Sequence, residues 1–212
     1  MPQLIAMVIV VVGAMIYMFQ TFGGTGDKIE GVAQKTSIVT EINNIKNGVQ
    51  LALRGDAMRA SDGTLATWVS NLEGIAELEY FPEQINNVLN TDETTKDTVN
   101  TYKAISFGSD DTLEITLVMP SAADADANAR PGLFIDISKG KLSTNVAFLE
   151  KQLTADLSSL ASIDSNASSA TYNSTLDIKG DIGTKATGGT DIDGKFVIYF
   201  KDLPRGMIDN TK

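Results

Sequence analysis

The most apolar part of the chain is its beginning. Residues 4–19 form a run of uncharged, mainly apolar side chains, and no charged residue occurs before Asp27. A helix rises about 1.5 Å per residue, so roughly 20 residues of this kind span the hydrocarbon of a bilayer. The β-branched stretch Val8–Val12 is typical of a buried strand, but such strands usually end after about 4–8 residues. The length of the run therefore predicts a hydrophobic helix.

A second hydrophobic pattern follows a cluster of glycines. Gly23, Gly24 and Gly26 predict a hinge, because each glycine costs a helix up to about 1 kcal/mol relative to alanine. From Asp27 onward the apolar positions step mostly by three or four residues, which predicts one face of an amphipathic helix. These positions are Ile29, Val32, Ile38, Ile42, Ile45, Val49 and Leu53. The two halves together predict a rod over residues 1–54, on the order of 75–80 Å long if fully helical.

Shorter patterns in residues 55–212 predict the rest of an α+β fold. Helical spacing occurs over residues 64–72, after Pro82, and from a cap at Ser143 or Thr144 to Leu160. Strand patterns occur at residues 102–107, 112–118, 133–137, 175–182 and 195–201. Turn residues predict that the first two strands pair with each other and that the last two do the same. Residues 158–175, rich in Ser, Ala and Asn, predict a surface loop.

The predicted architecture is thus a long N-terminal helix with a glycine break, packed on a C-terminal domain with an antiparallel sheet and short helices. We divide the chain into residues 1–26, the apolar helix with its hinge, residues 27–54, the amphipathic half, and residues 55–212, a soluble head domain. About 150 residues are enough for one domain with its own core.

The composition of the chain argues against several classes of function. A net charge of −10 argues against a nucleic-acid-binding surface, which needs clustered Lys and Arg. The chain has no histidine, the commonest general base, and no cysteine, which excludes disulfides and thiolate metal sites. No nucleophile elbow, P-loop or paired-carboxylate motif stands out. We therefore expect a protein that is not an enzyme.

The first 54 residues resemble the N-terminus of a type IV pilin, most closely the type IVb branch or pseudopilin and archaeal-pilin relatives. The resemblance implies a basic leader removed before Met1, an inner-membrane-anchored precursor, and N-terminal helices that bundle into a cell-surface filament through the pilus assembly machinery. The whole chain would then be shaped like a lollipop. The residues implied to form the polymerisation core are Met1, Leu4, Ile5, Val8, Val11, Val12, Gly13, Ile16, Phe19 and Phe22.

Two departures from the family leave the subunit type open. Pilins usually carry Glu at the fifth mature position, where this chain has Ile5, and major pilins often carry a C-terminal disulfide. A divergent major subunit, a tip-located minor pseudopilin and an archaeal pilin all remain open, as do adhesion, motility, DNA uptake and secretion. The alternatives are a single-pass membrane-anchored extracytoplasmic binding or adhesion domain that does not polymerise and, least favoured, an anchored secreted hydrolase.

One acidic loop begins like a calcium site. Asp124, Asp126 and Asn128 have the spacing of oxygen ligands in a calcium loop. The pattern then fails, because Ala129 stands where such a loop needs Gly and Ile135 where it needs a bidentate Glu. We expect no cofactor, with Ca²⁺ at this loop as the alternative.

Two sequons for N-glycosylation occur in the polar region after residue 158. They begin at Asn166, which precedes Ala167-Ser168, and at Asn173, which precedes Ser174-Thr175. Their use depends on the organism, and O-linked sugar on the many Ser and Thr residues nearby is a comparable possibility.

Overall fold

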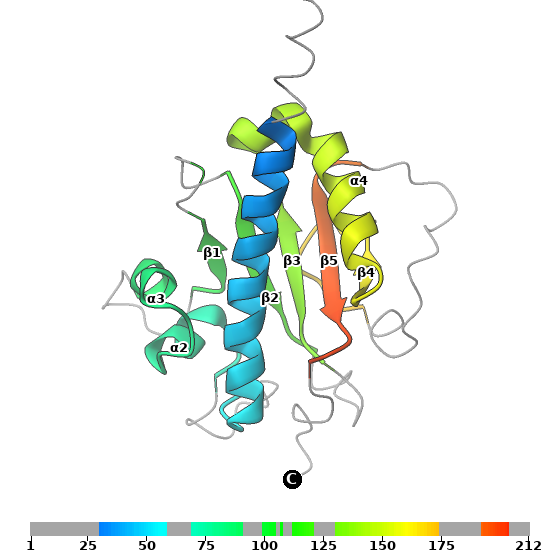
Figure 1. The fold of residues 1–212 in the computed structure, drawn as a ribbon. Coiled ribbons are helices and arrows are strands. Elements are labelled where there is room, and N and C mark those ends of the chain that lie inside the picture. The colour runs from blue at the N-terminus through cyan, green and yellow to red at the C-terminus, as the bar shows by residue number, and fades with distance from the viewer. Residues whose placement is uncertain are drawn as a thin grey trace, which may run out of the picture.

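A long helix over residues 30–54 lies across one face of a five-stranded antiparallel sheet (Figure 1). The structure is a computed structural model, and it describes residues 30–58, 69–90, 99–104, 107, 112–120, 130–173 and 192–203. The buried side chains of the helix that join the main core are Ile38, Ile42, Ile45, Val49, Ala52 and Leu53. The predicted amphipathic helix is therefore confirmed over this range, whereas Val32, expected on the same face, is 53% exposed.

The sheet has the strand order β1-β2-β3-β5-β4, with every neighbouring pair antiparallel. Its strands are β1 (Thr101–Lys103), β2 (Glu114–Val118), β3 (Gly132–Asp136), β4 (Ala161–Asp164) and β5 (Lys195–Phe200). Successive side chains of a strand point to opposite faces, so register aligns apolar residues in rows. One such row runs through Leu117, Leu133, Ile198 and Ile163 on the face beneath the long helix.

The opposite face of the sheet carries a smaller apolar cluster. Val118, Phe134, Val197 and Tyr199 form it, and Ala167 and Tyr172 pack against it. The rings of Tyr172 and Tyr199 meet edge to face, with centroids 5.7 Å apart. Aromatic pairs favour this geometry, so the segment that follows β4 is fastened to the face of the sheet that the long helix does not cover.

Four shorter helices complete the described fold: α2 (Leu72–Glu77), α3 (Glu83–Leu89), the 3-10 helix η2 (Gly140–Asn145) and α4 (Val146–Leu157). In Figure 1, α4 lies beside the long helix in front of β5, while α2 and α3 lie at the β1 side of the sheet. The helix predicted after Pro82 is confirmed as α3, with Ile85 and Leu89 buried. The helices thus form one layer over one face of the sheet.

The prediction of a continuous loop over residues 158–175 was wrong, because β4 lies within it. The predicted pairing of the last strand with residues 175–182 was also wrong, since β5 lies between β3 and β4. Residues 174–191 are outside the described part of the chain. β4 is only four residues long, and its pairing with β5, not local propensity, makes it a strand.

Two helix boundaries also differ from the predictions. Val69, expected in a helix over residues 64–72, instead forms an isolated parallel bridge with Met58, and α2 begins only at Leu72. Ser143 and Thr144 were expected to cap the helix that is α4. Both lie within η2, where their hydroxyls donate to backbone carbonyls one turn earlier, and Asn145 is the N-cap residue of α4.

Candidate assembly surface

Most residues that the sequence nominates for function precede residue 30. The polymerisation residues from Met1 to Phe22 and the hinge glycines Gly23, Gly24 and Gly26 lie outside the described residues, and so does the acidic loop of Asp124, Asp126 and Asn128. Asn166 and Asn173 are described and lie after β4. The structure therefore bears on function through the long helix, to which the apolar N-terminal run leads in the sequence.

The long helix packs closely against a neighbouring segment at Gly48. The ring of Phe81, which precedes α3 and is 5% exposed, occupies the space that a side chain at residue 48 would need. Glycine is costly inside a helix, and close packing is a physical reason to keep it there. Sequence analysis did not single out Gly48, although a glycine inside a regular helical period is a signal for such a contact.

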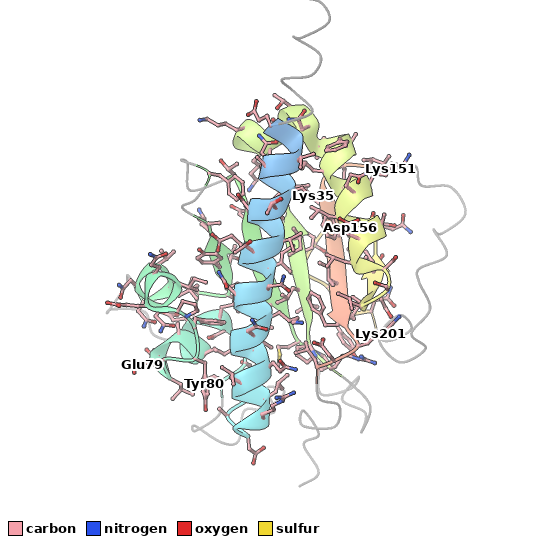
Figure 2. The ribbon with its side chains drawn as sticks, in the orientation of Figure 1. Lys35, Glu79, Tyr80, Lys151, Asp156 and Lys201 are labelled. Carbon is pink, nitrogen blue, oxygen red and sulfur yellow. The ribbon has the colours of Figure 1, made fainter. Side chains whose placement is uncertain are left out.

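Two charged contacts join one side of the long helix to the rest of the fold. The Lys35 ammonium lies 2.7 Å from the Asp156 carboxylate on α4 (Figure 2). The Lys46 ammonium lies 2.9 Å from the Asp202 carboxylate and 5.0 Å from the centre of the Phe200 ring. Exposed ion pairs are worth only about 0–1 kcal/mol each. Their contribution is therefore small beside that of the buried apolar face of the helix.

A buried hydroxyl links the helix to the edge strand β1. Tyr102 is 3% exposed, and its hydroxyl donates a hydrogen bond to the Glu41 carboxylate over 3.1 Å. Burial, followed by the nearby Glu41 charge and this hydrogen bond, raises the pKa of Tyr102 well above its usual value. Tyr102 therefore stays protonated as a donor at any physiological pH.

The first turns of the described helix are held differently. Between residues 30 and 37 only Gly31 is buried, and a Cβ atom there would lie 3.0 Å from Cε1 of Phe148 on α4. Val32 and Phe148 are both substantially exposed, at 53% and 40%. The core side chains of the helix begin at Ile38. In its described part, then, the helix is embedded in the head at its C-terminal end and becomes superficial toward residue 30.

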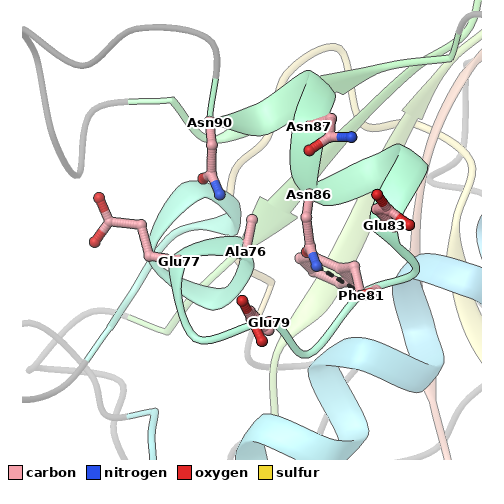
Figure 3. Close-up of a pocket in the computed structure, with 8 residues that line it drawn as sticks. All are labelled: Ala76, Glu77, Glu79, Phe81, Glu83, Asn86, Asn87 and Asn90. Atoms are coloured by element: carbon pink, nitrogen blue, oxygen red, sulfur yellow. Dashed lines mark hydrogen bonds between the residues drawn. The ribbon is translucent and has the colours of Figure 1, made fainter.

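A polar hollow lies between α2 and α3 (Figure 3). Its volume is about 530 Å³, and it is lined by Ala76, Glu77, Glu79, Phe81, Glu83, Asn86, Asn87 and Asn90. Asn86 donates through Nδ2 to the Phe81 carbonyl over 2.9 Å, while its Oδ1 is buried without a hydrogen-bond partner. Ligand pockets are mostly apolar with a few polar groups, unlike this hollow. Within the described residues, no group of three or more acidic side chains is placed to hold a metal ion.

No helix among the described residues combines the length and apolarity needed to cross a bilayer. Neither a scan against protein-family models nor searches of curated proteins and of solved structures gave a match. The structure itself therefore describes the protein: it has an α+β fold with one long, partly embedded helix, and an apolar run precedes that helix in the sequence.

Proposed function

We propose that the protein is a structural subunit of an extracellular, type IV pilus-like helical filament. The observation that carries the proposal is the way the long helix is held. Its apolar face is buried from Ile38 to Leu53, its first described turns are superficial, and residue 30 follows the uncharged apolar run 4–19 closely in sequence. A helix embedded at one end and leading to an apolar segment at the other suits a head domain carried on a polymerising stem.

Assembly would transfer the apolar stem from lipid to a bundle of identical stems. The precursor would be anchored in the inner membrane, and the assembly machinery would extract it into a homo-oligomeric filament at the cell surface. Burial of apolar area is worth about 25 cal/mol per Å², but lipid already shields this surface before assembly. Close packing must therefore supply much of the gain, for which small residues such as Gly13 and Ala14 are suited. The glycines at 23, 24 and 26 would let the stem bend relative to the head.

The buried apolar face of the long helix would fix the head on that stem, and two ion pairs add a small restraint. Lys35, just before the embedded part, pairs with Asp156, and Lys46, near the middle of that part, pairs with Asp202. With the helix fixed at two points along its length, rotation of the head about the helix axis is restrained. Each subunit of a helical polymer needs such a defined orientation, because the same contacts repeat at every step.

Electron microscopy of the full-length protein purified from the cells that make it tests the proposal. We expect filaments of uniform width. Ile5→Asp places a charge in the stem at a cost of up to about 3 kcal/mol, and Gly13→Leu enlarges a small packing position. We expect both variants to lose most of their filaments while the head keeps its circular dichroism spectrum. Ile5→Leu and Gly13→Ala are the matched controls, and both should assemble.

Two results would contradict the proposed filament. Protein that stays monodisperse in detergent-free buffer, or normal filaments in both Ile5→Asp and Gly13→Leu, would contradict a polymerising stem. A monodisperse, membrane-bound protein would instead support the alternative, a single-pass anchored binding domain that does not polymerise.

A further inference from the structure

The segment after β4 contains two sequons seven residues apart, and their asparagines differ in exposure and in hydrogen bonding. Asn166 is exposed, in a turn directly after the strand. Asn173 is half-buried, next to Tyr172, whose ring packs on Tyr199 in the apolar cluster on the sheet. Sequence alone gives no means of ranking the two, because both match the same three-residue pattern.

The side chain of Asn166 is exposed, whereas its backbone is fixed by a hydrogen bond. Its backbone N–H donates to Oδ1 of Asp164 over 3.1 Å, which forms a turn stabilised by a side chain. Among the described residues its side-chain amide has no hydrogen-bond partner, and Ser168, the hydroxyl residue of the sequon, is exposed as well. The stretch from Ser165 to Ala170 pairs with no strand of the described sheet, so an enzyme can reach this backbone from outside.

Asn173 is committed to the fold by two hydrogen bonds. Its Nδ2, the atom that would carry a sugar, donates to Oδ2 of Asp164 over 2.8 Å. Its backbone N–H donates to the hydroxyl of Tyr199 over 2.6 Å. A hydrogen bond to a carboxylate is stronger than one between neutral groups. Access to Asn173 therefore requires this segment to leave the sheet, whereas access to Asn166 does not.

We propose that Asn166 is an N-glycosylation site of the folded protein and that Asn173 is not modified. The donor is a saccharide carried on a lipid phosphate or pyrophosphate, and the catalyst is a membrane oligosaccharyl transferase. Nδ2 of Asn166 forms a bond to the anomeric carbon, and the bond from that carbon to the phosphate oxygen breaks. The lipid phosphate leaves with the electron pair, and Nδ2 loses one proton to a base of the transferase. No oxidant or reductant is involved.

The proposal requires export of the head domain but not polymerisation. Ala167 packs on the cluster that covers the face of the sheet opposite the long helix. A glycan at Asn166 would therefore lie away from the helix that the proposed filament would bury, and it would be compatible with assembly.

Mass spectrometry of the full-length protein from its natural cells tests the site. Chymotrypsin separates the two sequons, because cleavage after Leu160, Tyr172 and Leu176 places Asn166 in residues 161–172 and Asn173 in residues 173–176. We expect most of the first peptide to carry a saccharide on the asparagine and the second peptide to be unmodified. An unmodified first peptide, or comparable modification of the second, would overturn the proposal.

Four variants assign the linkage. Asn166→Gln and Ser168→Ala should both remove the saccharide completely, whereas Ser168→Thr and Asn173→Gln should keep it. Retention in Asn166→Gln would place the sugar on a nearby hydroxyl or on Asn173 and would refute the assignment. Filament formation can be scored on the same samples, so failure of the site and failure of the filament proposal are read separately.

Discussion

Two glycines of the long helix offer a matched test of how the helix is docked. Gly48 and Gly31 lie in the same helix, and alanine at either position favours the helix by up to about 1 kcal/mol. Their surroundings differ. A Cβ at residue 48 overlaps the ring of Phe81, which is 5% exposed, whereas a Cβ at residue 31 meets the edge of Phe148, which is 40% exposed.

The expected effects follow from whether each ring has room to move. Phe148 can turn toward solvent, so Gly31→Ala should be neutral or should raise the free energy of unfolding by up to about 1 kcal/mol. Phe81 is enclosed, so Gly48→Ala should add an overpacking cost of about 1–3 kcal/mol, partly offset by the gain in helix propensity. Because that gain is common to both variants, Gly48→Ala should be less stable than Gly31→Ala by about 1–3 kcal/mol.

Urea unfolding of the full chain in one mild detergent, followed by far-UV circular dichroism, measures this difference. Phe81→Leu provides the control for cause. If the overlap with the ring is responsible, Phe81→Leu should cost less in the Gly48→Ala background than in the wild type, which a double-mutant cycle reports as a coupling energy.

The reasoning fails if Gly48→Ala is as stable as Gly31→Ala, or if the cycle shows no coupling between Gly48 and Phe81. Either result would mean that the long helix does not approach the segment before α3 as closely as the structure places it. The arrangement of the helix on the head would then need revision.

Two further predictions concern backbone strain and alkaline pH. Glu79 follows α2 with a φ of 60°, a conformation that favours glycine, so Glu79→Gly should stabilise the head by about 0.5–1 kcal/mol. The charge-matched variant Glu77→Gly lies inside α2 and should destabilise the head by about 1 kcal/mol. Urea unfolding compares the two variants, and an equal loss of stability in both would contradict a role for Glu79 in ending the helix. The pKa of Tyr102 is raised by burial and by Glu41, so its contribution to stability is complete below the unfolded pKa of about 10 and declines as pH rises above it. Stability of the wild type should therefore fall more steeply above about pH 10 than that of Tyr102→Phe, and identical slopes would refute the assignment.

The elements that sequence analysis predicted correctly have either a sustained period or a short continuous apolar run. The spacing from Ile38 to Leu53 repeats over several turns, and each of these positions is buried. β3 and β5 are short runs of almost wholly apolar residues, which fits strands that are covered on both faces. In these elements the local pattern and the tertiary environment require the same residues, so the pattern alone is sufficient.

The elements that sequence analysis missed depend on contacts far away in the chain. β4 reads Ala-Ser-Ile-Asp, which is too short for a period, and it becomes a strand because β5 presents a free edge to it. Gly48 signals close packing only once Phe81 is known to lie against it. The difference between Asn166 and Asn173 likewise depends on Asp164 and Tyr199, and no three-residue motif contains that information.

The two ends of the described long helix are held differently, and the proposed stem accounts for this asymmetry. The C-terminal end is closed: Ala57 and Asp56 donate to the carbonyls of Ala52 and Leu53, and Asp56 takes the left-handed conformation that stops a helix. Toward residue 30, by contrast, core contacts end at Ile38. In a filament, tension on the stem would act along the helix axis and would load the buried side chains from Ile38 to Leu53 together, in shear, instead of separating them one at a time.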